Sequence, residues 1–428
     1  MVRLAVVVVA LALLSCGART GLSQEEREED VCSVARDAGT PPLRSVCSSA
    51  PPPPCTPSGP ELCNGLDDDC DGGIDEELAL QWVGGPWIVR DEGDGRAGGC
   101  DECGDPQSST LVERRGAPHV VWDFGFDPEA QRSNVFGRRL GRDGPEGPVE
   151  PIGDYTAMFV DSAETLASLL TVCERTGDFG QARWSVAGGP LQAPLGECEQ
   201  RCVDSVVGSR NGRCHAIARV RTETVVLDIA GETGEPLATY DLWEPDRLMQ
   251  LGIWTHEGTT AVVAGRENGG EARVFFWDPD GLRSRAVRVP DPGRGWRRPR
   301  IVRTDAGWLV LGASEELVAA VVQESGRIVQ PPRAIGDAVI REFAATRQGP
   351  HRVAVVETTR DFSGTVFTTA VVVLDAEGRA VAPRLSAPDG LGWRFPSIHP
   401  IDDQLIVTYV VQQPSFTQVR AAALGCAR

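Results

Sequence analysis

Residues 61–77 read ELCNGLDDDCDGGIDEE, and seven carboxylates are crowded into the last eleven of them, residues 67–77. A run of like charges is tolerated where a cation or bulk water screens it. Asp67, Asp69 and Asp71 alternate and Gly72 follows, so the stretch has the form D-x-D-x-D-G-x-I-D. Calcium loops use this spacing because alternating carboxylates converge on one ion in a tight coil, while the glycine permits a sharp turn.

The spacing also indicates which groups would hold the ion. We predict a ligand set of Asp67, Asp69, Asp71, the carbonyl of Gly73, Asp75 and Glu76. These oxygen ligands suit Ca²⁺, whereas copper prefers histidine, methionine or thiolate, so calcium is the predicted ion. Leu78 stands where an EF-hand has its bidentate glutamate, which disfavours a complete EF-hand. A solvated acidic turn and a site for another metal remain as alternatives.

The same residues resemble the MopE-type metal-binding motif of bacterial surface proteins, whose pattern is roughly C-[ND]-G-x-D-[ND]-D-C-D-G-x-x-D-E. The matching residues are Cys63, Asn64, Gly65, Asp67, Asp68, Asp69, Cys70, Asp71, Gly72, Asp75 and Glu76. The resemblance implies a metal-binding loop. The motif occurs here once, whereas related proteins often carry several copies.

The two cysteines of this stretch are candidates for a disulfide. A bridge between Cys63 and Cys70 would close a short loop and hold the carboxylates together before the ion binds, which lowers the entropy lost on binding. The loop would then stiffen the connection to the rest of the protein.

The N-terminus has the features of an export signal. Arg3 precedes the apolar run LAVVVVALALL, which is too short to span a bilayer and ends at LLSC. The segment resembles a bacterial lipoprotein signal over residues 1–15, with Cys16 lipidated and Gly17 favouring the outer membrane. Leu14 is larger than that pattern prefers, so a plain secretory signal remains an alternative.

The other cysteines agree with an exported protein. Without Cys16, 12 of the 13 cysteines remain, an even number that an oxidising compartment would allow to pair. Cys100 and Cys103, with Cys198 and Cys202, could instead bind zinc, but exported thiols of this kind are usually oxidised. We therefore predict disulfides.

Composition separates a tether from a globular body. Residues 16–60 are rich in proline and acidic residues and carry little apolar periodicity, which is typical of a disordered tether. The net charge of −19 opposes binding to nucleic acid. The expected partners are a protein or polysaccharide at the cell surface, with the lipid anchor in the membrane.

Beyond residue 115 the sequence repeats a polar turn followed by an apolar strand. Seven turn markers recur 42 to 54 residues apart: Gly116, Glu164, Gly212, Gly258, Gly307, Gly349 and Asp403. A second series of turns lies between them, near Gly144, Gly188, Gly231, Gly281, Gly326 and Gly378. Two alternating hairpins per repeat predict a four-stranded antiparallel sheet.

These repeats predict an all-β fold, a seven-bladed β-propeller over residues 79–428. The seventh repeat has only three strands, and an unpaired edge would expose backbone hydrogen-bonding groups. Residues 79–90 are apolar, precede the first repeat and could supply the missing strand. A β-sandwich pair and an open solenoid are the alternatives.

The sequence offers no motif for catalysis. The five histidines are scattered, and no serine lies in a G-x-S-x-G elbow. Six tryptophans at strand positions could stack on a sugar, but they are expected in the core: Trp122, Trp243, Trp254, Trp277, Trp308 and Trp393. We predict a surface-anchored binding or scaffolding lipoprotein rather than an enzyme. The alternative is a secreted propeller enzyme that acts on polysaccharide, as a glycosidase or lyase.

Overall fold

The computed structural model describes residue 57, residues 79–91 and most of residues 108–427. Within the last range it leaves out 115, 124–134, 154–156, 163–168, 177–178, 187–195, 199–205, 211–213, 222–223, 232–234, 244–248, 267–269, 279–280, 283–285, 294, 314, 337–338, 350, 361–366, 402–403 and 414–415. The described residues contain strands and no helix, and hence no helix that could cross a bilayer. The all-β prediction is confirmed. The predicted signal, Cys16, the metal loop over 61–78 and all of the tether except residue 57 lie outside the described residues.

Antiparallel sheets account for all the strands in this part of the chain, and the first four sheets lie within residues 109–289. Sheet I contains β2 (Ser109–Arg114), β3 (Ala117–Asp123), β4 (Val135–Gly141) and β5 (Gly144–Gly153). Sheet II contains β6 (Ala157–Ser162), β7 (Leu169–Thr176), β8 (Phe179–Val186) and β9 (Gly196–Cys198). Sheet III contains β10 (Val206–Arg210), β11 (Cys214–Arg221), β12 (Thr224–Gly231) and β13 (Pro236–Trp243). Sheet IV contains β14 (Met249–His256), β15 (Thr259–Arg266), β16 (Ala272–Asp278), β17 (Gly281–Leu282) and β18 (Val287–Val289), and its outer strand is split because β17 and β18 both pair with β16.

The remaining strands form three more sheets. Sheet V contains β19 (Arg297–Thr304), β20 (Gly307–Ala313), β21 (Leu317–Val322) and β22 (Ile328–Ala334). Sheet VI contains β23 (Ile340–Gln348), β24 (Arg352–Arg360), β25 (Phe367–Asp375) and β26 (Leu385–Ser386). Sheet VII contains β27 (Arg394–Ile401), β28 (Gln404–Gln413), β29 (Phe416–Ala427) and, from the other end of the chain, β1 (Ala79–Asp91).

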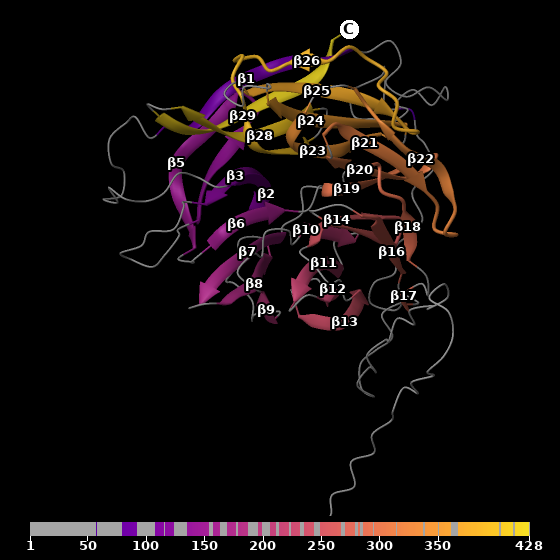
Figure 1. The fold of residues 1–428 in the computed structure, drawn as a ribbon. Coiled ribbons are helices and arrows are strands. Elements are labelled where there is room, and N and C mark those ends of the chain that lie inside the picture. The colour runs from indigo at the N-terminus through magenta and orange to yellow at the C-terminus, as the bar shows by residue number, and fades with distance from the viewer. Residues whose placement is uncertain are drawn as a thin grey trace, which may run out of the picture.

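The first strands of these sheets meet in a closed ring. Strand β2 contacts β6, β6 contacts β10, and the contacts continue through β14, β19, β23 and β27 back to β2. In Figure 1 the labelled first strands β2, β6, β10, β14, β19 and β23 lie around the middle of the molecule, and the outer strands lie toward the rim. Sheets that stand side by side around a common centre form a β-propeller.

The repeat turns of the sequence fall at the expected places in the sheets. Four of the seven markers belong to the described residues, and they lie where the first strand of a sheet turns into the second: Gly116, Gly258, Gly307 and Gly349. The five described members of the second series lie where the third strand turns into the outer one: Gly144, Gly231, Gly281, Gly326 and Gly378. Gly116 and Gly378 have φ values of 72° and 78°, a conformation that glycine adopts without strain.

The middle strands of each sheet carry the core. Every residue of β20 and β21 is buried, whereas the outer strand β22 alternates between exposed and half-buried residues. A strand that is covered on both faces reads as a continuous apolar run, because neighbouring sheets remove both of its faces from water. One apolar cluster extends through sheets IV, V and VI and includes Phe276, Trp296 and Trp308.

Strand β1 occupies the fourth place of sheet VII, which is where the sequence predicts a strand over residues 79–90. It pairs antiparallel with β29 from Ala79↔Ala427 to Asp91↔Gln418. The outer edge of the C-terminal strands is thus paired with the N-terminal segment of the body. This pairing closes the ring with backbone hydrogen bonds between two segments that are far apart in the sequence.

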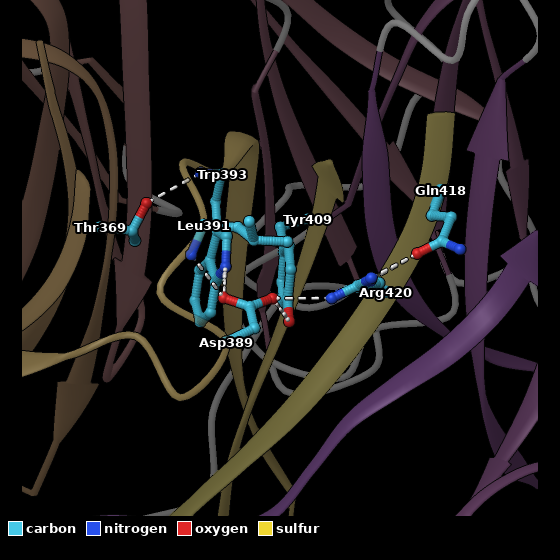
Figure 2. A network of polar contacts seen from close by, with 7 residues as sticks. All are labelled: Thr369, Asp389, Leu391, Trp393, Tyr409, Gln418 and Arg420. Atoms are coloured by element: carbon cyan, nitrogen blue, oxygen red, sulfur yellow. Dashed lines mark hydrogen bonds and ion pairs between the residues drawn. The ribbon is translucent and has the colours of Figure 1, made fainter. Parts of the chain in front are cut away.

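A buried aspartate joins the connection before sheet VII to the strands of that sheet (Figure 2). Asp389 accepts hydrogen bonds from the Trp393 indole at 3.0 Å and the Tyr409 hydroxyl at 3.2 Å, and Arg420 donates to it at 3.0 Å. Trp393 and Tyr409 stack with their ring centroids 3.7 Å apart. Trp82 of β1 packs edge-on against Trp393 and donates to the Ser386 carbonyl, so the closing strand rests on this cluster.

Polar links also connect the first strands of sheets IV to VII. Gln250 of β14 accepts a hydrogen bond from the backbone amide of Arg298 in β19. Glu342 of β23 accepts one from the backbone amide of Phe395 in β27, and the Arg298 guanidinium lies 3.8 Å from Glu342. Arg298 and Phe395 both have a φ of 48°, an unusual conformation for residues with side chains. They occupy the same place in two copies of G-W-R-x-P, at 295–299 and 392–396.

Replacing Asp389 by alanine should destabilise the fold by about 3–5 kcal/mol, because it leaves the buried Arg420 charge and two ring donors without their acceptor. Asp389→Asn keeps one acceptor oxygen and should lose less. Urea unfolding followed by tryptophan fluorescence measures both. Equal unfolding midpoints for the wild type and Asp389→Ala would contradict this role.

Candidate functional site

The predicted metal ligands Asp67, Asp69, Asp71, Gly73, Asp75 and Glu76 lie outside the described residues, as do Cys16, Cys63 and Cys70. Calcium binding at this loop therefore stays a prediction. In the part of the chain that is described, no group of three or more His, Cys, Asp and Glu side chains is placed to hold a metal ion.

Six tryptophans and three of the histidines lie in the interior of the protein. The six tryptophans expected in the core are all buried, which confirms that prediction. His119, His215 and His399 are also buried. His256 is half-buried, and its Nδ1 lies 3.1 Å from Nη1 of Arg347, which can only donate. Burial, followed by the charge of Arg347, lowers the pKa of His256.

A cavity of about 480 Å³ lies at the junction of sheets V and VI and is the candidate binding site. Its lining includes Arg333, Ile335 and Gly336 from sheet V and its exit, and Val372, Arg379 and Arg384 from sheet VI. The size is in the range of pockets that hold small molecules. Three arginines on one cavity make a concentration of hydrogen-bond donors in a chain whose net charge is −19.

Arg384 connects the two sheets at this cavity. Its Nε lies 3.1 Å from Oε1 of Glu357 in β24, and its Nη2 donates to the Ile335 carbonyl at 3.4 Å. A side chain at Gly336 would place its Cβ 2.4 Å from the same Nη2 atom, so the glycine makes room for the guanidinium. Arg384 is therefore held between a buried carboxylate and the backbone of the neighbouring sheet.

Glu357 is fully buried, and within the described part of the chain its carboxylate oxygens lack the hydrogen bonds that a buried carboxylate usually accepts. Neither of its oxygens accepts a well-aligned hydrogen bond from the described residues, and the contact with Arg384 is an ion pair. Burial raises the pKa of Glu357 to about 6, although the charge of Arg384 acts in the opposite direction. Glu357 does not line the cavity itself and is connected to it through the ion pair with Arg384.

The turn after β25 completes the cavity and docks on sheet V. Arg333 of β22 donates through Nη2 to the Glu377 carbonyl at 3.0 Å, and Thr304 donates to the Ala376 carbonyl at 2.9 Å. A Cβ at Gly378 would lie 2.8 Å from Leu309 and 2.9 Å from Ala319. The turn thus approaches sheet V closely, which fixes Arg379 at the cavity rim.

This arrangement is suited to binding. Guanidinium groups present planar arrays of donors to oxygen acceptors. Glu357 has no exposed surface, so its effect on a bound molecule would pass through Arg384. The sequence analysis does not identify this cavity, because its arginines come from separate strands and turns and do not form a motif. The D-x-E-G-R sequence of the turn at 375–379 is a local signal of a tight turn only.

Comparisons with known proteins assign no family. No family model and no curated protein matches the chain. Among solved structures, the β-propeller domain of the Trilobed protease from Pyrococcus furiosus is similar at 9% identity with a TM-score of 0.44, over 75% of this chain and 94% of that one. Kuenenia stuttgartiensis hydrazine synthase is similar at 16% identity and 0.40, over 60% and 76%. An exo-1,5-α-L-arabinanase from a bovine ruminal metagenomic library is similar at 12% identity and 0.32, over 51% and 92%. They assign no activity to this chain.

The raised pKa of Glu357 predicts a pH-dependent cost to stability. The folded carboxyl binds its proton up to about pH 6, whereas the unfolded one releases it near pH 4.5, so its contribution is favourable below pH 4.5 and is lost as pH rises through 6. Glu357→Gln should therefore raise the melting temperature by a few degrees at pH 7.5, for a gain of about 2 kcal/mol, and change little at pH 4.5.

Glu146→Gln is the matched control, because Glu146 forms an exposed ion pair with Arg139 and should shift the melting temperature little at either pH. Thermal unfolding by circular dichroism measures the four differences. If Glu357→Gln melted below the wild type at pH 7.5, the buried carboxylate would be a stabilising group and the expectation would be wrong.

Proposed function

We propose that this protein is an extracytoplasmic lipoprotein that uses a seven-bladed propeller to bind a partner at the cell surface. The observation that carries the binding role is the preformed cavity between sheets V and VI, lined by Arg333, Arg379 and Arg384. A cavity whose polar groups are held in place before a ligand arrives loses little entropy on binding.

The seven sheets of the described residues support the proposed blade count. Their first strands contact one another in a closed ring, and β1 completes the sheet that the C-terminal strands begin. A closed ring leaves each face as a fixed platform for loops, because the sheets cannot slide apart without breaking the β1–β29 pairing. Such a platform suits a binding or scaffolding protein.

Disulfide bonds support an oxidising location. Cys214, at the start of β11, and Cys426, in β29, are both disulfide-bonded. Such bonds are formed and kept in exported proteins and are rare in reducing compartments. Together with the signal-like residues 1–15, they favour export, with Cys16 as the lipidated residue and the outer membrane as the proposed location.

The acidic loop supplies a second binding function in this proposal. Asp67, Asp69, Asp71, Asp75 and Glu76 would surround one Ca²⁺ ion together with the carbonyl of Gly73, and a Cys63–Cys70 bridge would close the loop. The acidic loop directly precedes β1 in the sequence, and this position suggests its role in the protein. A filled loop would stiffen the entry to the strand that closes the propeller.

Calcium should bind to the full chain with one site and a dissociation constant in the micromolar to millimolar range, because the predicted ligands are hard oxygens. Asp69→Asn with Asp71→Asn should abolish it, whereas Asp143→Asn, at an exposed turn outside the loop, should not. Calorimetric titration under oxidising conditions distinguishes these cases. Calcium binding that survives the double substitution would disprove this ligand set.

Cys16→Ala should release the protein from membranes of a bacterial host that processes lipoproteins, because the acyl chains are attached to that thiol. Fractionation and the mass of the mature N-terminal peptide measure the change. Substitution of Cys63 is the control and should leave the protein in the membrane fraction. An unmodified, soluble wild-type protein would favour the plain secretory signal instead.

A further inference from the structure

We propose that the cavity between sheets V and VI binds an oxyanion, a carboxylate or phosphate group, through the guanidinium groups of Arg333 and Arg384. The inference names a ligand class for the binding role proposed above and rests on that role. It depends on the contacts of described residues, and neither the metal loop nor the lipid anchor enters it.

Arg333 and Arg384 retain donors for a ligand after their contacts with the protein are made, whereas Arg379 forms ion pairs with Asp375 and Glu377. A guanidinium carries five N–H groups. Arg333 uses Nη2 toward the Glu377 carbonyl, and Arg384 uses Nε toward Glu357 and Nη2 toward the Ile335 carbonyl. Within the described part of the chain, Nη1 of both residues makes no such contact. Two cationic donor groups on one cavity match the paired oxygens of an oxyanion.

The cavity is built from both sheets, which holds the donors in a fixed relation. Arg333 belongs to sheet V and Arg384 to sheet VI, and each bonds to a backbone carbonyl contributed by the other sheet. Gly336, with a φ of 116°, leaves the space that the Arg384 guanidinium fills. An oxyanion bound here would touch both sheets and strengthen their junction.

The protonation state of Glu357 determines whether the positive charge of Arg384 is available to a ligand. The charge that acts on Glu357 is that of Arg384. The other charged groups of the site are Arg333 on β22, Asp375 at the end of β25, and Glu377 and Arg379 on the turn that follows. When Glu357 is ionised, it neutralises Arg384. When it is protonated, with a pKa of about 6, the charge of Arg384 is available to a ligand. Oxyanion affinity should therefore rise as pH falls through 6, and a bound oxyanion should raise the pKa of Glu357 by the same coupling.

The test titrates the full-length protein with glucuronate, inorganic phosphate and glucose by calorimetry. Glucuronate keeps its charge between pH 5.5 and 7.5, so its affinity reports the protein, and we expect binding about fivefold tighter or more at pH 5.5. Glucose should not bind. Phosphate at pH 7.5 distinguishes the two sources of an oxyanion: binding of either anion supports the site, and the tighter one identifies the group it prefers.

Variants localise the binding. Arg333→Gln should weaken glucuronate about tenfold or more, because it removes a charged donor. The double variant Arg384→Gln with Glu357→Gln removes the ion pair without leaving a buried charge and should weaken binding similarly. Glu357→Gln alone should bind at pH 7.5 as the wild type binds at pH 5.5. Arg288→Gln, an exposed arginine on β18, is the control and should bind normally.

The proposal is overturned if neither anion binds, if glucose binds as well as glucuronate, or if the cavity variants bind like the Arg288→Gln control. Retained calcium binding and membrane anchorage in the same preparation would then limit the failure to this site. Loss of those two properties with oxyanion binding intact would instead count against the lipoprotein and metal loop and leave the cavity assignment standing.

Discussion

The structure depends on the pairing of its first described strand with its last. A sheet edge left unpaired exposes backbone groups that water or another chain must satisfy, and the edge of β29 is paired with another segment of the same chain. Here β29 offers the edge and β1 fills it from Ala79 to Asp91. The two strands are more than 300 residues apart in the sequence, so their pairing connects the two ends of the propeller body. The conformation of every other sheet is thereby coupled to one junction.

Apolar contacts have no preferred direction, so on their own they would let neighbouring sheets slide past one another. Hydrogen bonds between the sheets fix their relative position. In sheets IV to VII, a side chain on the first strand of one sheet accepts a hydrogen bond from a backbone amide of the next sheet. Gln250 accepts from the amide of Arg298, and Glu342 accepts from the amide of Phe395. At the closing junction Ser109 donates to Thr408, and Thr110 lies 3.3 Å from His399. Leaving a buried acceptor without its donor raises the free energy of the fold. Each link therefore destabilises a shifted arrangement of the sheets by more than it stabilises the native one.

The sequence predicts those features that arise from local periodicity. Turn glycines recur with each repeat because every sheet needs the same bends, and the missing strand follows from counting strands in the last repeat. The links between sheets are harder to predict because their partners are separated by about one repeat, as Gln250 and Arg298 are. The repeated G-W-R-x-P was a usable signal, since it places Arg298 and Phe395 in the same backbone conformation. The cavity had no such signal, because Arg333 and Arg384 come together only when sheets V and VI are docked. Calcium binding at residues 61–77 stays a prediction.

The cavity and the ring place opposite demands on Glu357. For stability alone, a neutral side chain in this fully buried position would be better, since ionisation at neutral pH opposes folding. The carboxylate nevertheless lies against Arg384, whose guanidinium also reaches the backbone of the next sheet. Without a buried anion the guanidinium charge would depend on solvent or a ligand for compensation. The ion pair therefore keeps the charged Arg384 at the sheet junction when no ligand is bound. Ionising the buried Glu357 lowers the stability of the fold, and the closed ring remains stable enough to tolerate this loss.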